Sequence, residues 1–358
     1  MKICVIGMRG FPQIEGGVEK HCEELYPRMR DDIHAVVYRR RPYVISDKRY
    51  DNIEFIDLPS TQIKGFEAFF HSLASTLNAI PKKPDLVHFH NIGSALFAPI
   101  IKLKKIPVVL TYHSPNYEHD KWNSAAKKFL LMCEKTALKY SDKIIFVNKF
   151  QMQRFPEEIQ KKSVYIPNGI NTAEKSFNTD YLEELCIEKN KYILSVGRIT
   201  PEKGFDTLIK AYNKAEKSGC KLVIAGGVEF ENSYMNELRR LAGDNVIFTG
   251  YVYGDKLMQL YTNAKLYILA SKNEGFPLVL LEAMSYGLDL IVSDIPATHL
   301  VDLDSDCYFD RDDINQLAEK ISRKLLTATN RKYDLSDFDW NKAAEDTAII
   351  YDSLVNKK

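Results

Sequence analysis

The chain has 358 residues, of which 45% are hydrophobic and 27% charged, and its formal net charge is +1 at pH 7. This composition is that of a globular protein and excludes intrinsically disordered and collagen-like chains. The length predicts two domains. No apolar run reaches the roughly 18 to 20 residues that a transmembrane helix needs. The six cysteines are scattered without a C-x-x-C pair, which indicates reduced thiols in a cytoplasmic protein rather than a zinc site.

The small net charge conceals two halves of opposite sign. Residues 1–166 contain 26 lysines and arginines against 18 aspartates and glutamates, a net charge of +8. Residues 167–358 contain 23 against 30, a net charge of −7. A basic half indicates an anionic neighbour. Because no nucleic-acid-binding motif is present, we expect a phosphate-bearing acceptor, or peripheral contact with the inner face of the plasma membrane, rather than nucleic acid. A solvated basic surface is the alternative.

In the first half, short apolar runs alternate with amphipathic stretches. Strands are expected at 3–7, 33–38, 53–57, 86–89, 107–112 and 143–147. Helices are expected near 17–30, 66–79, 94–104 and 122–140. Short β-branched runs separated by helices predict parallel strands that are buried on both faces and joined by βαβ units.

The same alternation begins again after a stretch rich in Pro, Gly and polar residues around 168–190. Strands are expected at 192–196, 221–225, 246–250, 266–270 and 290–293. Helices are expected near 203–217, 231–242, 254–262, 278–286 and 312–327, and a last one at 339–355. Two such series predict an α/β fold made of two Rossmann-like, doubly wound domains.

The clearest chemical motif is N-E-G-F-P-L-V-L-L-E-A-M-S-Y-G at 273–287. Glu274 follows a predicted strand, and Glu282 lies eight positions later in the next helix. Between them, Gly275 and Pro277 lead into the helix start, where backbone N–H groups and the helix dipole attract phosphate. Carboxylates accept hydrogen bonds from hydroxyls, so two of them beside an anion site suit a sugar nucleotide. The alternative is a helix whose glutamates cap and solvate its first turn.

A second motif, V-G-R-I-T-P-E-K-G at 196–204, follows the first strand of the second domain. Arg198 and Lys203 are expected at the carboxyl end of that strand, where ligands bind in open α/β sheets. A guanidinium fork and an ammonium together suit a diphosphate. The alternative is two exposed cations at a helix N-terminus, which would oppose the helix dipole unless an anion offsets them.

The third motif is G-M-R-G-F-P-Q-I-E-G-G-V-E-K-H at 7–21, again a strand, a glycine-bearing loop and a helix. Its spacing is not G-x-G-x-x-G, so it lacks the dinucleotide-binding fingerprint. Gly16 and Gly17 open the helix and would let backbone amides approach a phosphate closely. A turn glycine pair is the alternative.

Together the three motifs resemble those of the retaining glycosyltransferases of family 4, which have the GT-B fold. The resemblance extends to the I-P-N-G-I segment at 166–170 and to a closing helix with Asp339, Trp340 and Tyr351. The segment 113–122 resembles, more loosely, bacterial polysaccharide rhamnosyltransferases. The resemblance implies two domains that face a cleft. Residues 1–168 would form the acceptor side and 169–338 the nucleotide-sugar domain, with helix 339–358 crossing back to the first domain.

The resemblance also implies two catalytic residues. Glu274 would meet the donor sugar, and His113, after the strand 107–112, would lie beside that sugar. Both would position the sugar and stabilise charge, because the leaving phosphate itself takes the acceptor proton in such enzymes. The configuration at the anomeric carbon would be retained, and neither a metal nor a cofactor would be required. For His113 the alternative is an ordinary hydrogen-bonded loop histidine.

The donor-binding residues are implied in the same way. Those expected around the diphosphate are Gly16, Gly17, Arg198 and Lys203. Those expected around the sugar and the nucleoside are Gly250, Tyr251, Val252, Gly275, Phe276, Leu278 and Glu282. Among them, Glu282 would bind the ribose hydroxyls and residues 250–252 would lie near the base.

The expected function is therefore transfer of a hexosyl group from a nucleoside-diphosphate sugar to a glycan or lipid-linked acceptor, in bacterial surface polysaccharide biosynthesis. Three alternatives remain. A nucleotide-sugar epimerase of the same fold would need no acceptor. An NADP-dependent oxidoreductase would use Arg39, Arg40 and Arg41 for a 2′-phosphate, but it lacks the glycine fingerprint. A non-catalytic nucleotide-sugar-binding partner of another transferase is the third.

Three further patterns are interpreted as structural. D-L-D-S-D at 302–306 lacks the glycine and distal glutamate of a calcium loop and predicts a solvated acidic loop. His88 and His90 share one face of a strand, but no third ligand is apparent, so we expect a polar pair at the edge of the cleft. An apolar helical stripe favours core packing over a lipid-facing surface; it contains Phe66, Phe69, Phe70, Leu73 and Leu77.

Overall fold

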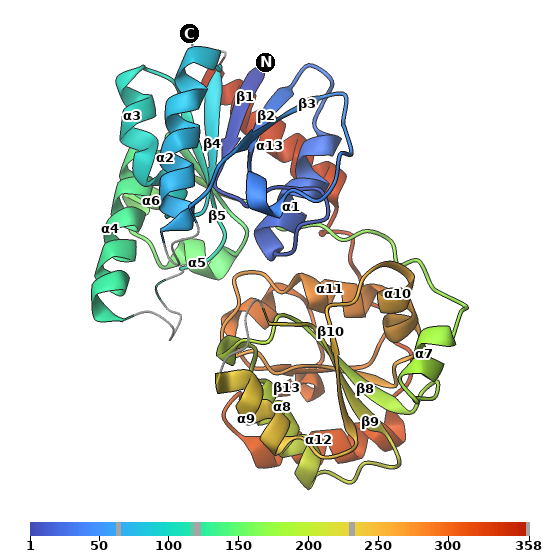
Figure 1. Cartoon of the computed structure of the whole chain (residues 1–358). Helices are drawn as coiled ribbons and strands as arrows, with labels where there is room; N and C mark the ends of the chain where they lie inside the picture. The colour runs from blue at the N-terminus through green and yellow to red at the C-terminus, as the bar shows by residue number, and fades with distance from the viewer. Residues whose placement is uncertain (62–65, 116, 118–122, 229–232, 356–358) are drawn as a thin grey trace. The chain divides into compact units, whose positions relative to one another are not determined.

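The computed structural model describes residues 1–61, 66–115, 117, 123–228 and 233–355 (Figure 1). The chain folds into two compact units, residues 1–169 with 337–358 and residues 170–336. These bounds differ by only one or two residues from the expected 1–168, 169–338 and 339–358. Among the described helices, none combines the length and apolar composition that crossing a bilayer requires.

The first unit contains a seven-stranded parallel sheet in the order β3-β2-β1-β4-β5-β6-β7. Its strands are β1 (Lys2–Ile6), β2 (His34–Arg40), β3 (Ile53–Leu58), β4 (Leu86–His90), β5 (Val108–Tyr112), β6 (Lys143–Phe146) and β7 (Ser163–Tyr165). The six strands expected from apolar runs are all present. The edge strand β7 was not predicted, because its three residues are only half-buried and form no apolar run.

Helices cover both faces of this sheet. They are α1 (Gly17–Leu25), α2 (Glu67–Ala79), α3 (Ala98–Leu103), α4 (Ser124–Tyr140), α5 (Lys149–Gln153), α6 (Glu157–Gln160) and α13 (Trp340–Val355). Val87 and Phe89 of β4 join a core that includes Ala79 of α2 and Ala137 of α4. The alternate residue His88 contacts Tyr351 of α13 instead. Because successive strand residues point to opposite faces, α2 and α4 cover one face and α13 the other.

Helix α13 packs on α1, β4 and the short 3₁₀ helix Tyr26–Arg28 (Figure 1). Trp340, Ala344 and Tyr351 are buried in this contact. At Gly169, where the chain leaves the first unit, a Cβ atom would lie 2.3 Å from the backbone nitrogen of Trp340, so the glycine permits the close approach. The prediction that the last helix packs back on the first domain is confirmed.

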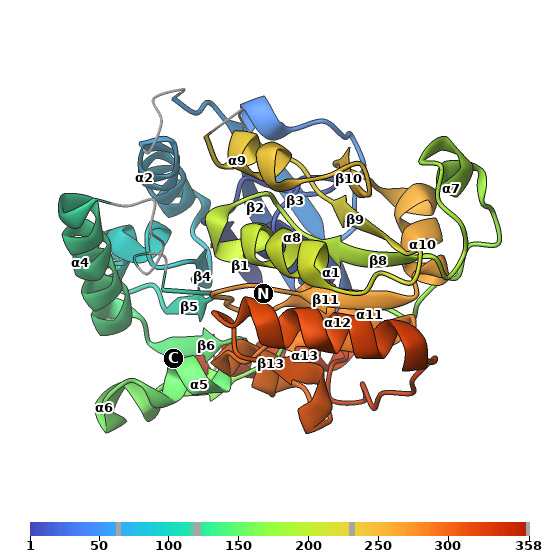
Figure 2. The ribbon, with the colours of Figure 1, turned by 90° about the horizontal axis from the view of Figure 1, so that it is seen from below.

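The second unit contains a six-stranded parallel sheet in the order β10-β9-β8-β11-β12-β13. Its strands are β8 (Tyr192–Val196), β9 (Lys221–Ala225), β10 (Val246–Gly250), β11 (Leu266–Leu269), β12 (Leu290–Ser293) and β13 (Tyr308–Phe309). Its helices are α7 (Asp180–Glu184), α8 (Phe205–Lys214), α9 (Ser233–Leu241), α10 (Gly254–Asn263), α11 (Leu278–Ser285) and α12 (Ile314–Thr327), shown from a second side in Figure 2.

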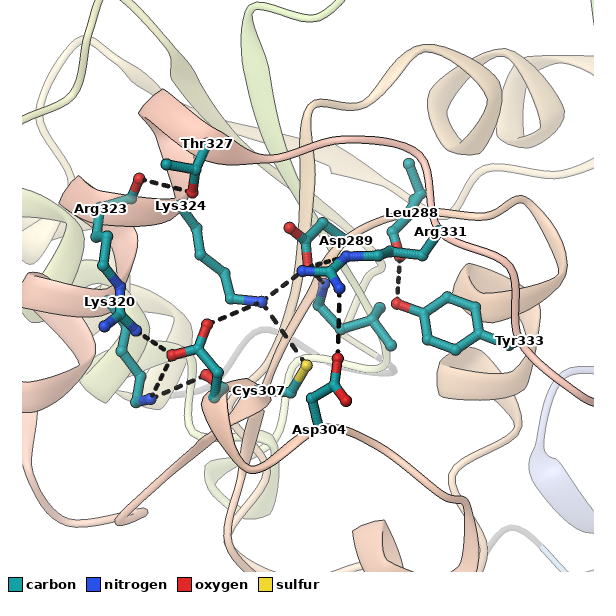
Figure 3. A network of polar contacts seen from close by, with 12 residues as sticks. Leu288, Asp289, Asp304, Cys307, Lys320, Arg323, Lys324, Thr327, Arg331 and Tyr333 are labelled. Atoms are coloured by element: carbon teal, nitrogen blue, oxygen red, sulfur yellow. Dashed lines mark hydrogen bonds and ion pairs between the residues drawn. The ribbon is translucent and has the colours of Figure 1, made fainter.

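A buried ion pair joins α12 to the start of β12 (Figure 3). The Lys324 ammonium lies 2.7 Å from the Asp289 carboxylate, and both side chains are only 2% exposed. The same carboxylate accepts a hydrogen bond from the backbone N–H of Leu290. Cys307 Sγ lies 3.7 Å from the Lys324 ammonium. The pair therefore ties a helix to the sheet in a setting that excludes water.

The acidic segment 302–306 lies beside this pair. Asp304 forms an ion pair with Arg331 (Figure 3), and Asp306 forms one with Arg323. The Asp304 side chain is 75% exposed and the Asp306 side chain 47%, as expected for a solvated acidic loop. The positive partners stabilise the loop modestly, because ion pairs in water contribute about 0–1 kcal/mol.

Candidate functional site

The loop after β8 is shaped by a glycine. Gly204 has φ +65°, and a Cβ atom at this position would lie 2.0 Å from the carbonyl oxygen of Ala270, just after β11. Only glycine allows the loop to approach the neighbouring strand this closely. The short 3₁₀ helix Pro201–Lys203 is thereby held at the carboxyl ends of β8 and β11, the edge where ligands bind in open α/β sheets.

At this edge, Lys203 and Glu274 form a close ion pair. The Lys203 ammonium lies 2.6 Å from Glu274 Oε1, and the side chains are 20% and 10% exposed. The hydroxyl of Ser271, which is fully buried, donates a hydrogen bond of 2.7 Å to the same oxygen. The structure thus joins two predicted site residues that are 71 positions apart and adds Ser271, whose position directly after the strand was the only sequence signal for it.

The motif continues into helix α11. Gly275 and Phe276 lie in the turn before it, and Leu278 is its first residue. All three residues are half-buried and lie at the N-terminal end of α11. Glu282, one turn into the helix, accepts a hydrogen bond of 2.9 Å from the Tyr261 hydroxyl. This tyrosine was not predicted; it orients the carboxylate expected to bind ribose.

Two other predicted donor-binding segments lie on neighbouring loops of the second unit. Arg198 is exposed, two residues after the end of β8. Gly250 is the last residue of β10 and has φ +70°. Tyr251 and Val252 are the first two residues of the loop that follows β10. A Cβ atom on Gly227 would lie 2.6 Å from the Tyr251 ring, so this ring lies directly on the glycine backbone after β9.

In the first unit, Gly16 and Gly17 begin helix α1 as predicted. Gly16 has φ +138°, and a Cβ atom there would lie 2.0 Å from Glu19 Oε2, whereas one on Gly17 would meet nothing within 4 Å. Glu19 Oε1 also accepts a hydrogen bond from the backbone N–H of Arg9. The backbone at Gly17 is therefore open, but a carboxylate that the sequence did not point out already lies at the start of the helix.

His113 belongs to a buried cluster of histidines on the α13 side of the first sheet. Its Nε2 lies 3.0 Å from Nδ1 of His90, and Nε2 of His90 lies 2.6 Å from the Tyr26 hydroxyl. His88 is hydrogen-bonded to Thr111 and, at 2.7 Å, to Tyr351 of α13. This chain of contacts fixes the orientation of the His113 ring from within the core.

The expectation that His88 and His90 lie at a cleft edge is wrong, because both side chains are fully buried. His90 instead groups with two imidazoles from other segments, which the sequence did not reveal. His21, His90 and His113 are buried, and one ring nitrogen of each lies within 4.8 Å of the others. His21 Nδ1 is 2.7 Å from Asn168 Oδ1, and its Nε2 has no hydrogen-bond partner in the described part of the chain.

Burial keeps these histidines neutral. It lowers the pKa of His21 to about 4 and that of His88 to about 3, and it lowers the pKa values of His90 and His113 well below 6.5, with neighbouring imidazolium charge adding to the effect. A neutral imidazole can donate one hydrogen bond to a sugar hydroxyl and accept another from one. The neutral imidazole is also the form that binds metal ions.

The first unit is expected to lose stability in mild acid. Because the folded-state pKa values are lowered, the unfolded chain binds protons first as the pH falls below about 6.5, and stability declines down to about pH 4. His21, with a pKa of about 4, would contribute about 3 kcal/mol over this range. Calorimetry at pH 7 and pH 5 should show a lower melting temperature for the first unit, whereas the second contains only His299.

Matched variants outside the cluster test the same linkage. Burial also lowers the pKa of His71 to about 4, so His71→Gln should flatten the pH dependence. Thr76→Val, on the same helix, provides the control, because it removes a buried hydrogen bond but no titratable group and should leave the pH dependence unchanged. A first-unit melting temperature that is equal at pH 7 and pH 5 would contradict the expectation.

Comparison with known proteins agrees with this geometry. Residues 15–174 match the family model Glycosyltransferase Family 4, and residues 178–335 match the model Glycosyl transferases group 1. An uncharacterized glycosyltransferase of Methanocaldococcus jannaschii is 27% identical over 321 residues, covering 82% of this chain and 81% of that protein. The alpha-monoglucosyldiacylglycerol synthase of Streptococcus pneumoniae is 28% identical, covering 84% and 72%.

Solved structures show the same fold. Sucrose-phosphate synthase from Thermosynechococcus elongatus superposes with a TM-score of 0.79 at 20% identity and covers all of both chains. Anabaena HepE, solved in complex with UDP-glucose, superposes with a TM-score of 0.75 at 16% identity, covering 99% of this chain and 100% of HepE. Two Rossmann-like parallel-sheet domains and two adjoining family models lead to one conclusion: the chain belongs to the family 4 glycosyltransferases and has the GT-B fold.

Proposed function

We propose that this glycosyltransferase moves a hexosyl group from a nucleoside-diphosphate sugar to a glycan or lipid-linked acceptor, with retention of configuration and without a metal ion. The observation that carries the proposal is the Lys203–Glu274 ion pair, supported by Ser271, at the carboxyl ends of β8 and β11. It places a cation for phosphate and a carboxylate for sugar hydroxyls side by side, in a site with little solvent.

The chemistry required of these groups is electrostatic. As the bond between the sugar and the diphosphate breaks, negative charge develops on the leaving phosphate, and Lys203 and Arg198 would stabilise it. The N-terminal end of α11 adds a positive dipole. The leaving phosphate would accept the acceptor proton, so no protein nucleophile is needed. Glu274 and His113 would hold the sugar in a reactive orientation, His113 through a ring held by His90.

Relatives support the substrate classes. HepE binds UDP-glucose in its solved structure, which favours a nucleoside-diphosphate sugar as donor. The streptococcal relative is named for a glucosylated diacylglycerol, and an Erwinia amylovora relative for amylovoran biosynthesis, which favours a lipid or polysaccharide acceptor. A 2′-phosphate site of the oxidoreductase type is disfavoured, since Arg39 is buried and paired with Asp57 at 2.6 Å.

Donor binding is expected to raise the thermal stability of the protein. A ligand at a hundredfold excess over its Kd stabilises the native state by about 2.7 kcal/mol. We expect a shift in melting temperature with one of UDP, GDP, dTDP or ADP, in EDTA as well as in magnesium, and its loss in Arg198→Ala. Arg240→Ala, which removes an exposed arginine on α9, is the matched control.

Other outcomes would point elsewhere. A shift with NADP⁺ alone would contradict the transferase proposal, and a shift that requires magnesium would contradict metal independence. Interconversion of a nucleotide sugar without any acceptor would identify an epimerase. Donor binding without transfer to any acceptor in a panel of glycans and lipid-linked sugars would favour a non-catalytic partner.

A further inference from the structure

Helix α2 has the polarity of its faces reversed. Its buried residues are largely polar, namely His71, Ser72, Ser75, Thr76 and Ala79. Its exposed face carries large apolar side chains: Phe66, next to its first residue, is 56% exposed, Phe70 47% and Leu77 52%. The prediction that this apolar stripe belongs to the core is therefore wrong for Phe66, Phe70 and Leu77. The other two residues of the stripe, Phe69 and Leu73, are half-buried.

Hydrogen bonds within the helix make this reversal stable. The Ser75 hydroxyl donates to the carbonyl of His71, and the Thr76 hydroxyl donates to that of Ser72. His71 Nε2 donates to the backbone carbonyl of Arg39 in β2. Because the buried polar groups have partners, the polar face can pack on the sheet, and the apolar face remains outside.

Helix α4 extends the same surface. The Phe69 ring of α2 lies 5.1 Å from the Phe97 ring and 6.2 Å from the Phe129 ring of α4, so the two helices are neighbours (Figures 1 and 2). On α4, Phe129 is 41% exposed, Leu131 37% and Met132 48%. We call the outer face of these two helices the α2–α4 face; its large exposed residues are Phe66, Phe70, Leu77, Phe129, Leu131 and Met132.

This face is also basic. Helices α2 and α4 contain four lysines, Lys127, Lys128, Lys135 and Lys139, and two glutamates. One of these, Glu134, is buried and accepts hydrogen bonds from the hydroxyls of Tyr112 and Tyr117. Lys128, Leu131 and Lys135 follow one another at helical spacing, so positive charge and apolar groups lie along one line.

We propose that the α2–α4 face docks on an anionic lipid surface. Aromatic and aliphatic side chains would enter the interface, and the lysines would extend to the anionic headgroups with their stems along the apolar surface. A second copy of the chain fits less well, because a two-fold contact would bring like-charged lysines together. A protein partner fits less well too, because lysine is depleted at the centre of protein interfaces.

The inference rests on the proposed function in one respect, the choice of acceptor. Docking of the first unit on a bilayer would bring this glycosyltransferase to acceptors carried by lipids rather than to soluble glycans. The donor-binding residues on the loops of the second unit are not part of the face, so donor binding and docking can be measured separately.

The test is cosedimentation of the whole protein with vesicles of phosphatidylcholine alone or with 30 mol% phosphatidylglycerol, at about 0.1 M salt. We expect binding to the anionic vesicles only. The variants Phe70→Ser/Met132→Ser and Lys128→Glu/Lys135→Glu should each weaken it more than tenfold. Controls elsewhere are Phe177→Ser, which removes a 91% exposed aromatic ring, and Lys189→Glu; both should bind as the parent does.

Binding that is absent, or that is unchanged in both double variants, overturns the proposal. A parent protein that is dimeric by light scattering and becomes monomeric in Phe70→Ser/Met132→Ser also overturns it, since a second copy then covers the face. All variants should keep the nucleoside-diphosphate thermal shift, which shows that they fold. If docking holds but no nucleoside diphosphate stabilises any form, the proposed function fails and the lipid contact stands.

Discussion

Replacing Lys203 by methionine is expected to lower kcat/KM for sugar transfer by roughly 10³-fold. The substitution keeps a similar length but removes the cation that would stabilise charge on the leaving diphosphate, and loss of one such group costs about 10²–10³ in rate. It also leaves the Glu274 carboxylate, 10% exposed, without its cation and with the Ser271 hydroxyl still donating a hydrogen bond to it. Steady-state kinetics with the donor identified by thermal shift measure the effect.

A nearby lysine provides the matched control. Lys272 lies on the same loop as Glu274, is 38% exposed and pairs with Asp206 at 3.6 Å. Lys272→Met should change kcat/KM by less than about threefold, as expected for an exposed ion pair. Lys203→Arg should recover part of the activity, because it restores the charge but not the point geometry of an ammonium. Equal losses in Lys203→Met and Lys272→Met would contradict the assigned role.

Replacing Lys324 by methionine is expected to destabilise the second unit by about 3–5 kcal/mol. Removing one partner of a buried ion pair leaves the other charge poorly compensated in a region of low dielectric. Here the Asp289 side chain is 2% exposed and would retain the Leu290 N–H as a close donor and, 3.6 Å away, the partly exposed Arg331 guanidinium. For a unit of this size the change corresponds to a fall in melting temperature of roughly 6–20 °C, measurable by calorimetry or urea titration.

A double variant separates the charge effect from packing. Lys324→Met/Asp289→Leu removes both charges and is expected to recover most of the lost stability, because apolar residues can replace buried ion pairs at little cost. Arg323→Met, at an exposed neighbouring position, should change stability by less than about 0.5 kcal/mol. If the double variant is no more stable than Lys324→Met, loss of packing rather than an unpaired carboxylate explains the result.

The Lys203–Glu274 pair shows how far sequence patterns reach. Apolar runs predicted β8 and β11, and the polar residues after them indicated a ligand-binding edge. The contact itself depends on the order of the strands, in which β11 pairs with β8 across two intervening strands of the sequence. Strand order is a property of the whole sheet, so local patterns could predict the two groups but not their 2.6 Å contact.

The histidines and helix α2 show where local patterns fail. Alternation along β4 placed His88 and His90 on one face, but the elements that cover that face are α1 and α13, the latter some 250 residues away in the chain. On α2, periodicity identified the apolar stripe but not which side faces inward. That side was decided by Ser75 and Thr76, whose hydroxyls bond to their own helix backbone and so permit burial of the polar face.

Helix α13 has a consequence for synthesis of the protein on the ribosome. The second unit is continuous in sequence, whereas the first unit includes a helix, α13, that follows the second unit in the chain. At roughly 5–20 residues per second, the polypeptide between Gly169 and α13 takes about 10–30 s to be made. During that interval the face of β4 that carries His88 lacks the Tyr351 hydroxyl. The first unit therefore cannot complete its fold until α13 has been synthesised. The second unit, although it begins later in the sequence, can complete its fold before the first.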